Sequence, residues 1–200
     1  IYLTLILLSS LIVKIFGLKN NGILCCGIWG FCGSKKPSID KLLLLGLINQ
    51  SRGGHSCGIY YENKFKKGVG TDKLFEDFMQ NNIFGEMTKD CKVVLGHNRY
   101  ATWGEHTADN AHPFLIKDRY AFTHNGSLKT FWDLLREKGK AWKDYDVDSV
   151  FLGDMLIEQG WDFLQEYEGG TAFLMNDMET GNVIAYHGAS NNYASGPEVE

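Results

Sequence analysis

The alternation of apolar and polar residues divides the chain into short strands and amphipathic helices. Residues 23–33 form a mostly apolar run after an Asn-Asn-Gly turn signal, which predicts a buried strand. After Pro37-Ser38 the apolar residues take helical spacing, and Ser-Arg-Gly-Gly at 51–54 ends this helix. The apolar face of the predicted helix consists of Ile39, Leu42, Leu43, Gly46 and Leu47.

The next part of the chain predicts a hairpin and a helix. Residues 55–62 and 64–69 have the composition of two strands joined around Asn63, a residue that favours turns. Residues 72–79 place their apolar side chains at helical spacing.

Two short strands in the middle of the chain lead into polar residues. The apolar strand 91–95 is followed by a polar run between glycines, residues 96–104, and strand 119–123 ends at His124-Asn125-Gly126. Polar residues at the end of a buried strand are a common location for a functional site. The alternative is a solvated loop, which does not explain so many side chains capable of chemistry in one run.

Two helices and two strands complete the pattern. Ser127 is placed to cap the first helix, Asp148 opens the second, and strands are predicted at 171–175 and 182–187. The order of strands and helices predicts an α+β fold in which helices cover a stack of sheets. The apolar stripe of the first of these helices consists of Leu128, Phe131, Trp132 and Leu135.

Composition and charge fit one globular domain. The chain has 200 residues, 44% hydrophobic and 22% charged, with 23 glycines and only 3 prolines, a balance that suits a sheet-rich fold with many tight turns. The formal net charge is −4 and the pI is about 5.9, so no basic field indicates a nucleic-acid partner.

The cysteines argue for a reducing compartment. They number 5, an odd count, and no repeated CxxC pair is present to hold zinc. We therefore expect a cytoplasmic protein. The five are Cys25, Cys26, Cys32, Cys57 and Cys91.

The first 25 residues read as a leader. Residues 1–18 are mostly Leu, Ile and Val but are short for a membrane span, and the bulky Leu24 stands where a lipoprotein signal needs a small residue. A propeptide or spurious upstream translation is the expectation, with a membrane anchor as the alternative. Residues 26–200 are expected to form the functional domain.

Cys26 is the candidate nucleophile, because a thiol beside a glycine leaves room for a substrate carbonyl. Amide hydrolysis by a thiol needs a base, donors for the tetrahedral oxyanion, and groups that hold the substrate. Any of the 6 histidines is an available base. The other solution is the α-amine of Cys26 itself, with a pKa near ~8, which requires Cys26 to be the first residue of the mature chain.

Five segments in order resemble the class II glutamine amidotransferase domains, which are N-terminal nucleophile hydrolases. CGIWG at 26–30 resembles the start of the family domain, and RGGHSCGI at 52–59 resembles its RGxDSxGI run. GHNRYATWG at 96–104 resembles GHxRxxTxG. NAHP at 110–113 with HNG at 124–126, and the Asp-Ser pair that begins at Asp148, complete the series.

The resemblance implies a role for six residues. Cys26 would attack the side-chain amide of glutamine, with its own amine as general base. Asn125, through its side chain, and Gly126, through its backbone N–H, would form the oxyanion hole. Three further residues would bind the substrate: Arg99 its α-carboxylate, Asp148 its α-ammonium, and Thr102, by assisting at the carboxylate end.

Each of these residues also has a plainer interpretation. By residue type alone, Arg99 fits better as a member of an exposed ion pair. Asp148 fits a helix N-cap, and Asn125-Gly126 fits a hairpin turn. Departures from the family pattern are Trp103 in place of His, Val150 in place of Glu, His55 in place of Asp and His187 in place of Arg.

The family resemblance implies a four-layer α-β-β-α sandwich of the N-terminal nucleophile hydrolase type. It implies a glutaminase that releases glutamate and ammonia through a Cys26 thioester, with no metal or organic cofactor. The partners implied are L-glutamine and a synthase domain or subunit that accepts ammonia; neither nucleic acid nor membrane is expected. Two alternatives stay open: an amidase for another amide, and an inactive module that binds glutamine.

Overall fold

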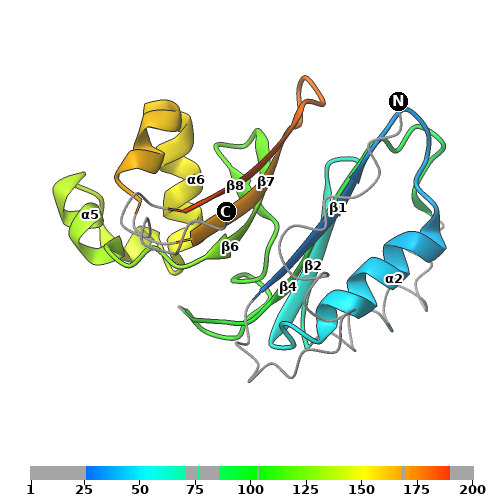
Figure 1. Cartoon of the computed structure of the whole chain (residues 1–200), viewed down its shortest axis with the longest axis horizontal. Coiled ribbons are helices and arrows are strands. Elements are labelled where there is room, and N and C mark those ends of the chain that lie inside the picture. The colour runs from blue at the N-terminus through cyan, green and yellow to red at the C-terminus, as the bar shows by residue number, and fades with distance from the viewer. Residues whose placement is uncertain (1–25, 71–75, 77–85, 103, 168–169, 190–200) are drawn as a thin grey trace, which may run out of the picture.

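In the part of the chain that the structure describes, two four-stranded antiparallel sheets form the frame (Figure 1). The structure is a computed structural model that describes residues 26–70, 76, 86–102, 104–167 and 170–189. Because its helices and two antiparallel sheets occur together, the chain has the predicted α+β class.

The first sheet has the strand order β1-β4-β2-β3. Its strands are β1 (Gly27–Cys32), β2 (Ser56–Tyr61), β3 (Lys64–Val69) and β4 (Val93–Arg99), and helix α2 (Ile39–Gln50) packs against β1 and β4. The predicted hairpin is confirmed. Its turn residues Glu62 and Asn63 have φ of 45° and 60°, the left-handed geometry of a tight hairpin turn.

The second sheet has the order β5-β6-β7-β8. Helix α6 packs against β5 and β6, and helix α5 follows the end of β6. The elements of this half of the chain are β5 (Phe114–Ile116), β6 (Tyr120–Gly126), α5 (Phe131–Glu137), the 3-10 helix η1 (Trp142–Asp144), α6 (Asp148–Gln159), the 3-10 helix η2 (Gly160–Gln165), β7 (Gly170–Asp177) and β8 (Val183–Ala189).

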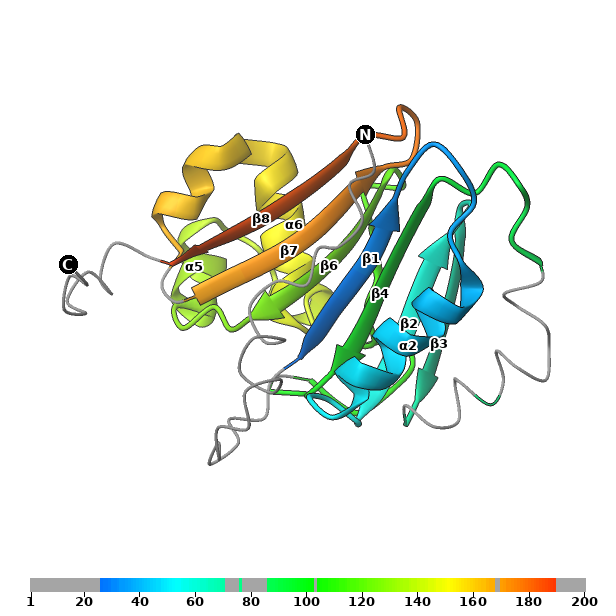
Figure 2. The same cartoon turned by 45° about the vertical axis from the view of Figure 1, so that its right-hand side comes forward.

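The two sheets meet where β6 contacts β1 and β4 (Figure 2). Ile28 and Leu95 of the first sheet share a buried apolar cluster with Ala121 of the second. Removal of such apolar surface from water is worth about 25 cal/mol per Å², so this contact helps to fix the two sheets against each other. The site described below lies at one end of this junction.

Strand β4 is longer than predicted. The apolar pattern placed its end at Leu95, but pairing continues to Arg99, and His97, Asn98 and Arg99 are all at most 3% exposed. Strand β4 is central, between β1 and β2, so its polar side chains must find partners inside the protein. The Trp29 indole, for example, donates to the Asn98 side chain at 2.8 Å.

The helices differ from the predicted ones in detail. Helix α5 begins at Phe131 after Thr130, so Ser127 is not its cap, and Trp132 is 50% exposed rather than buried. In α2, Leu47 is 51% exposed, whereas the polar Asn49 is buried against Gly27 of β1. The helix predicted at 72–79 lies outside the described residues except at position 76.

Strand β1 begins at Gly27, directly after Cys26, which places the candidate nucleophile at the strand's entrance. Strand β6 continues through Gly126, so the interpretation of Asn125-Gly126 as a hairpin turn is wrong. No helix in the described part of the chain has the length and apolarity that a membrane crossing requires.

Candidate active site

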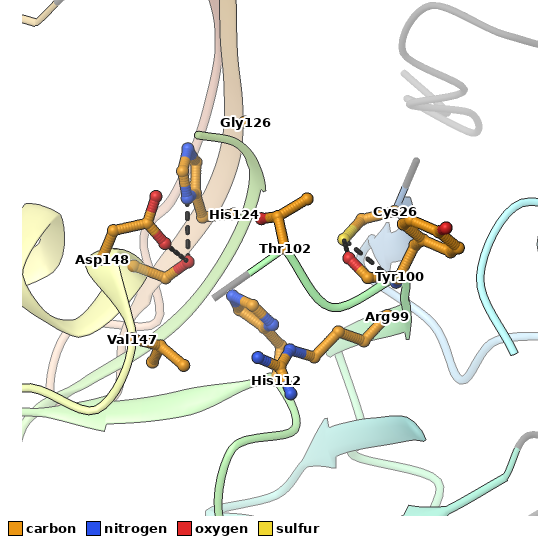
Figure 3. Close-up of a pocket in the computed structure, with 10 residues that line it drawn as sticks. Cys26, Arg99, Tyr100, Thr102, His112, His124, Gly126, Val147 and Asp148 are labelled. Carbon is orange, nitrogen blue, oxygen red and sulfur yellow. Dashed lines mark hydrogen bonds between the residues drawn. The ribbon is translucent and has the colours of Figure 1, made fainter. Parts of the chain in front are cut away.

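A pocket at the junction of the sheets gathers five of the six predicted site residues (Figure 3). Figure 3 shows Cys26 and Arg99 at one side of this pocket and Gly126 and Asp148 at the other. The residues that line it are Cys26, Arg99, Tyr100, Thr102, His112, His124, Gly126, Val147, Asp148 and Ser149.

Cys26 is half-buried and is held by its neighbours at both the thiol and the backbone. The Tyr100 N–H donates to Cys26 Sγ at 3.3 Å, and Sγ lies 3.4 Å from the Tyr100 carbonyl oxygen. Arg52 Nε donates to the Cys26 carbonyl at 3.1 Å. The sequence does not reveal the contact of Tyr100 with Cys26, because the Tyr100 backbone makes it.

The segment from Arg99 to Thr102 lies close to Cys26 because Gly53 makes room for it. A Cβ at Gly53 would stand 2.5 Å from the Arg99 carbonyl carbon and 2.6 Å from the Tyr100 nitrogen. Only glycine allows this approach of two backbones. The Arg-Gly pair of the second motif therefore has a structural reason. Arg52 donates to the Cys26 backbone, and Gly53 leaves space for the Arg99–Thr102 segment beside Cys26.

Arg99 is a buried cation, 3% exposed, so its interpretation as an exposed ion-pair member is wrong. Burial lowers the pKa of Arg99, whereas the proximity of Cys26 and of Asp148 raises it. An arginine stays charged even so, because its ordinary pKa is above ~12. One guanidinium N–H donates to the Glu105 carbonyl at 2.9 Å, and the side chain lines the pocket.

Asp148 is a buried carboxylate, 5% exposed, at the start of α6. Val147 is the N-cap of the helix, so the interpretation of Asp148 as an N-cap is wrong by one residue. Asp148 Oδ2 instead accepts the Leu128 N–H at 2.8 Å, and Ser149 Oγ donates to Oδ1 at 3.4 Å. Asp148 therefore joins the start of α6 to the loop that follows β6.

Behind Asp148 runs a chain of buried hydrogen bonds. Because the Ser149 hydroxyl donates to Asp148, His124 Nδ1–H donates to Ser149 Oγ at 2.9 Å. His124 Nε2 then accepts from the Tyr167 hydroxyl at 3.3 Å. Burial lowers the pKa of His124, which agrees with a neutral ring that donates at one nitrogen and accepts at the other. Every donor in this chain points toward the Asp148 carboxylate.

Two further histidines lie buried between the sheets. His97 Nε2 is 3.0 Å from the His124 carbonyl oxygen, and the rings of His97 and His112 stack at 3.9 Å. Burial lowers the pKa of His97 to about 3 and that of His112 well below its usual value. His112 also lines the pocket, and its only signal in the sequence was the NAHP block.

Gly126 closes the pocket at the end of β6. A Cβ there would stand 2.6 Å from His124 Nε2 and 2.7 Å from the Tyr167 hydroxyl oxygen, so the position requires glycine.

Asn125 is half-buried and is not among the residues that line the pocket. Side chains alternate along a strand, so Asn125 shares a face of β6 with Ala121 and Thr123. Ala121 packs against Ile28 and Leu95 of the first sheet. The face of β6 that carries Asn125 is therefore turned toward the first sheet.

Thr102 is exposed at the rim of the pocket and links the two halves. Its Oγ1 is 3.2 Å from Ser127 Oγ, which follows β6. The neighbouring Trp103, a departure noted in the sequence, lies outside the described residues.

The pocket contains the groups that nucleophilic attack on a small zwitterion requires. It combines a thiol with a buried cation and a buried anion on opposite sides of one pocket. The family model for class-II glutamine amidotransferases matches residues 54–153. The chain therefore belongs to the class-II glutamine amidotransferases.

Curated relatives carry the same domain within longer proteins. The chain is 35% identical over 144 residues to the glutamine–fructose-6-phosphate aminotransferase (isomerizing) of Methanococcus maripaludis, covering 69% of this chain and 23% of the relative. It is 30% identical over 150 residues to the amidophosphoribosyltransferase of Methanocaldococcus jannaschii, covering 67% and 30%. The aminotransferase of Lactococcus lactis is 28% identical over 178 residues, covering 80% and 28%. The match thus spans less than a third of each relative.

Proposed function

We propose that this domain is a glutaminase that hydrolyses the side-chain amide of L-glutamine to glutamate and ammonia. The observation that carries the proposal is that Arg99 and Asp148, both buried and of opposite charge, line the same pocket as Cys26. A plain amide has no use for such a pair. An amino acid presents a carboxylate and an ammonium that match both charges.

The substrate would lie between the two charges. One guanidinium N–H of Arg99 donates to the Glu105 carbonyl, and the planar guanidinium would make a forked contact with the α-carboxylate. Asp148 would accept from the α-ammonium, and Thr102 would assist at the carboxylate end. Because the network behind Asp148 is already hydrogen-bonded, the carboxylate is held in place before substrate arrives.

The chemical step follows from a free amine on Cys26. The amine takes the thiol proton, the thiolate attacks the amide carbon, and the tetrahedral oxyanion accepts from the Asn125 side chain and the Gly126 N–H. The same amine then protonates the leaving ammonia, and water hydrolyses the thioester. Loss of one oxyanion donor in such a site typically raises the barrier by ~3–4 kcal/mol.

The same proposal includes the family's fold, a four-layer α-β-β-α sandwich of the N-terminal nucleophile hydrolase type. Its support is that α2 packs on the first sheet, α6 on the second, and β6 contacts β1 and β4.

The free amine requires that the mature chain begin at Cys26, and we include this maturation in the proposal. Cleavage of the bond after Cys25 would convert residues 1–25 into a removed leader. The position of Cys26 immediately before β1, at the rim of the pocket, supports this.

The released ammonia would pass to an acceptor domain or partner subunit. The relatives' names describe transfer to fructose 6-phosphate in one case and a phosphoribosyl compound in the other. Both compounds are phosphorylated sugars. We therefore propose that the acceptor partner of this chain is a synthase that transfers ammonia to a phosphorylated sugar.

The proposal is tested by measuring ammonia release from glutamine, asparagine and a simple aliphatic amide. We expect release from glutamine alone, and none from the Cys26→Ala variant. Equal rates on all three amides would support an amidase of other specificity. Absence of release by protein that begins at Cys26 would support an inactive glutamine-binding module.

A further inference from the structure

His55 lies beside the loop that holds the nucleophile. It directly precedes β2, and its backbone N–H donates to the Arg99 carbonyl at 3.1 Å. Its ring is stacked between Tyr100, at 4.6 Å between ring centroids, and His106, at 4.1 Å. Backbone and ring together place His55 against the whole Arg99–Ala101 segment.

The contact that matters is made by His55 Nδ1, which accepts the Ala101 N–H at 3.0 Å. The preceding amide, that of Tyr100, donates to Cys26 Sγ at 3.3 Å. Two successive N–H groups of one short loop therefore have separate acceptors: the Tyr100 N–H donates to the Cys26 thiol, and the Ala101 N–H donates to His55. Rotation of the peptide at Ala101 disturbs the Tyr100 amide as well, because the two share one backbone.

This contact exists only while His55 is neutral. An imidazolium carries hydrogen on both nitrogens and cannot accept, so Nδ1 must be unprotonated and Nε2 must carry the hydrogen. Among the residues that the structure describes, three groups face the ring: Arg99 from β4, Tyr100 from the loop and His106 from the next loop. Burial, then His106, then Arg99 lower the pKa of His55, so its surroundings favour the accepting form.

We propose that His55 is a positioning residue for Cys26: as a neutral ring it holds the Ala101 amide and so keeps the Tyr100 amide on the thiol. Protonation turns the acceptor into a donor beside the Arg99 cation and releases the loop. The catalytic consequence rests on the proposed glutaminase function, whereas the bond to Ala101 does not.

The activity test compares wild type with His55→Asn and His55→Ala between pH 5 and 8. Asn keeps an acceptor oxygen near the place of Nδ1 but cannot titrate, and Ala has no acceptor. We expect His55→Ala to lose about tenfold in kcat/KM at pH 7.5, the order of one hydrogen bond, and Asn to recover most of that loss.

The decisive quantity is the ratio of His55→Asn activity to wild-type activity. This ratio cancels the titration of the Cys26 amine and thiol, which both proteins share. We expect it to rise as pH falls, with a midpoint below 6.5. A ratio that is constant with pH would overturn the proposal. His187→Asn, at an exposed position on β8, is the matched control and should give a constant ratio.

A second readout needs no glutaminase activity. The amide resonances of Ala101 and Tyr100, followed by NMR through the same pH range, should shift with one midpoint in wild type and stay fixed in His55→Asn. If the protein lacks glutaminase activity but the Ala101 resonance titrates in this way, the contact stands and the proposed function fails. If Ala101 does not respond to His55, the positioning role is refuted whatever the activity.

Discussion

The two sides of the pocket are built differently. On the side of the second sheet, Asp148 is anchored by Leu128 and Ser149 and, through Ser149, by His124 and Tyr167 in the interior. On the side of the first sheet, half-buried Cys26 is held by contacts to a loop at Tyr100 and to the Arg52 side chain.

The packing beneath each side follows the same division. The second sheet and α6 enclose a large apolar cluster in which Phe122, Phe151 and Phe173 are fully buried. The first sheet is covered by α2, whose outward residues Leu44 and Leu47 are 57% and 51% exposed. The two sides therefore divide the work: the second side presents the Asp148 carboxylate, fixed by an interior hydrogen-bond network, and the first side presents the buried Arg99 cation and a thiol held by the Tyr100 loop.

The largest effect is expected at Asn125, the proposed oxyanion donor on the second sheet. Asn125→Ala should reduce kcat for glutamine about 10²–10³-fold with little change in KM, because the lost donor acts on charge that develops in the transition state. Gly170→Ala is the matched control on the neighbouring strand, since a Cβ there meets no atom within 4 Å. An Asn125→Ala enzyme with normal kcat would remove this residue from the mechanism.

A smaller effect is expected at the buried anion. Asp148→Asn keeps an oxygen for the Leu128 N–H but loses the charge that would face the substrate ammonium. We expect kcat/KM for glutamine to fall about 10–100-fold, the range for a hydrogen bond to a charged group. Glutaramate, which lacks the α-amino group, should be hydrolysed equally by both proteins. A similar loss on glutaramate would mean that Asp148 acts only on structure.

The junction between the two sides should be sensitive to acid. Burial lowers the pKa of His97 to about 3 and also lowers those of His112 and His124, so the unfolded chain binds more protons than the folded one below the ordinary histidine pKa near ~6.5. Stability is therefore complete above that pH and is lost as pH falls. The expected slope is up to about 1.4 kcal/mol per pH unit for each histidine, measured by urea unfolding between pH 7 and 5. A flat profile would contradict neutral buried rings.

The smallest effects should separate the two sides most clearly. Tyr167→Phe removes the hydroxyl that donates to His124 and should cost about 1 kcal/mol of unfolding free energy with a modest change in activity.

Arg52→Gln removes the guanidinium contact to the Cys26 carbonyl and should lower kcat several-fold with little change in stability. The reverse pattern would contradict the division of work between the sides.

The sequence predicted the order of elements well because apolar spacing and turn residues act locally. It failed where tertiary contact decides. His97, Asn98 and Arg99 read as a loop because they are polar, yet strand pairing on both edges of β4 keeps them in the sheet. Trp132 reads as core because it is apolar, yet the face of α5 that carries it is exposed.

The sequence predicted only part of the candidate site. Cys26, Arg99, Thr102, Gly126 and Asp148 were identified by motif and line one pocket. The contact of the Tyr100 N–H with Cys26 and the chain of hydrogen bonds behind Asp148 were not predictable. A residue's type does not indicate a contact made by its backbone or a partner distant in sequence.

Above all, we propose that Cys26 is a nucleophile with a free amine, assembled with groups from both sheets. The most direct test is intact-mass measurement of the full chain after expression and treatment with an electrophilic glutamine analogue. We expect the mass of a chain that begins at Cys26 and carries one adduct, which the Cys26→Ala variant does not acquire. Active, labelled protein that still retains residues 1–25 would contradict it.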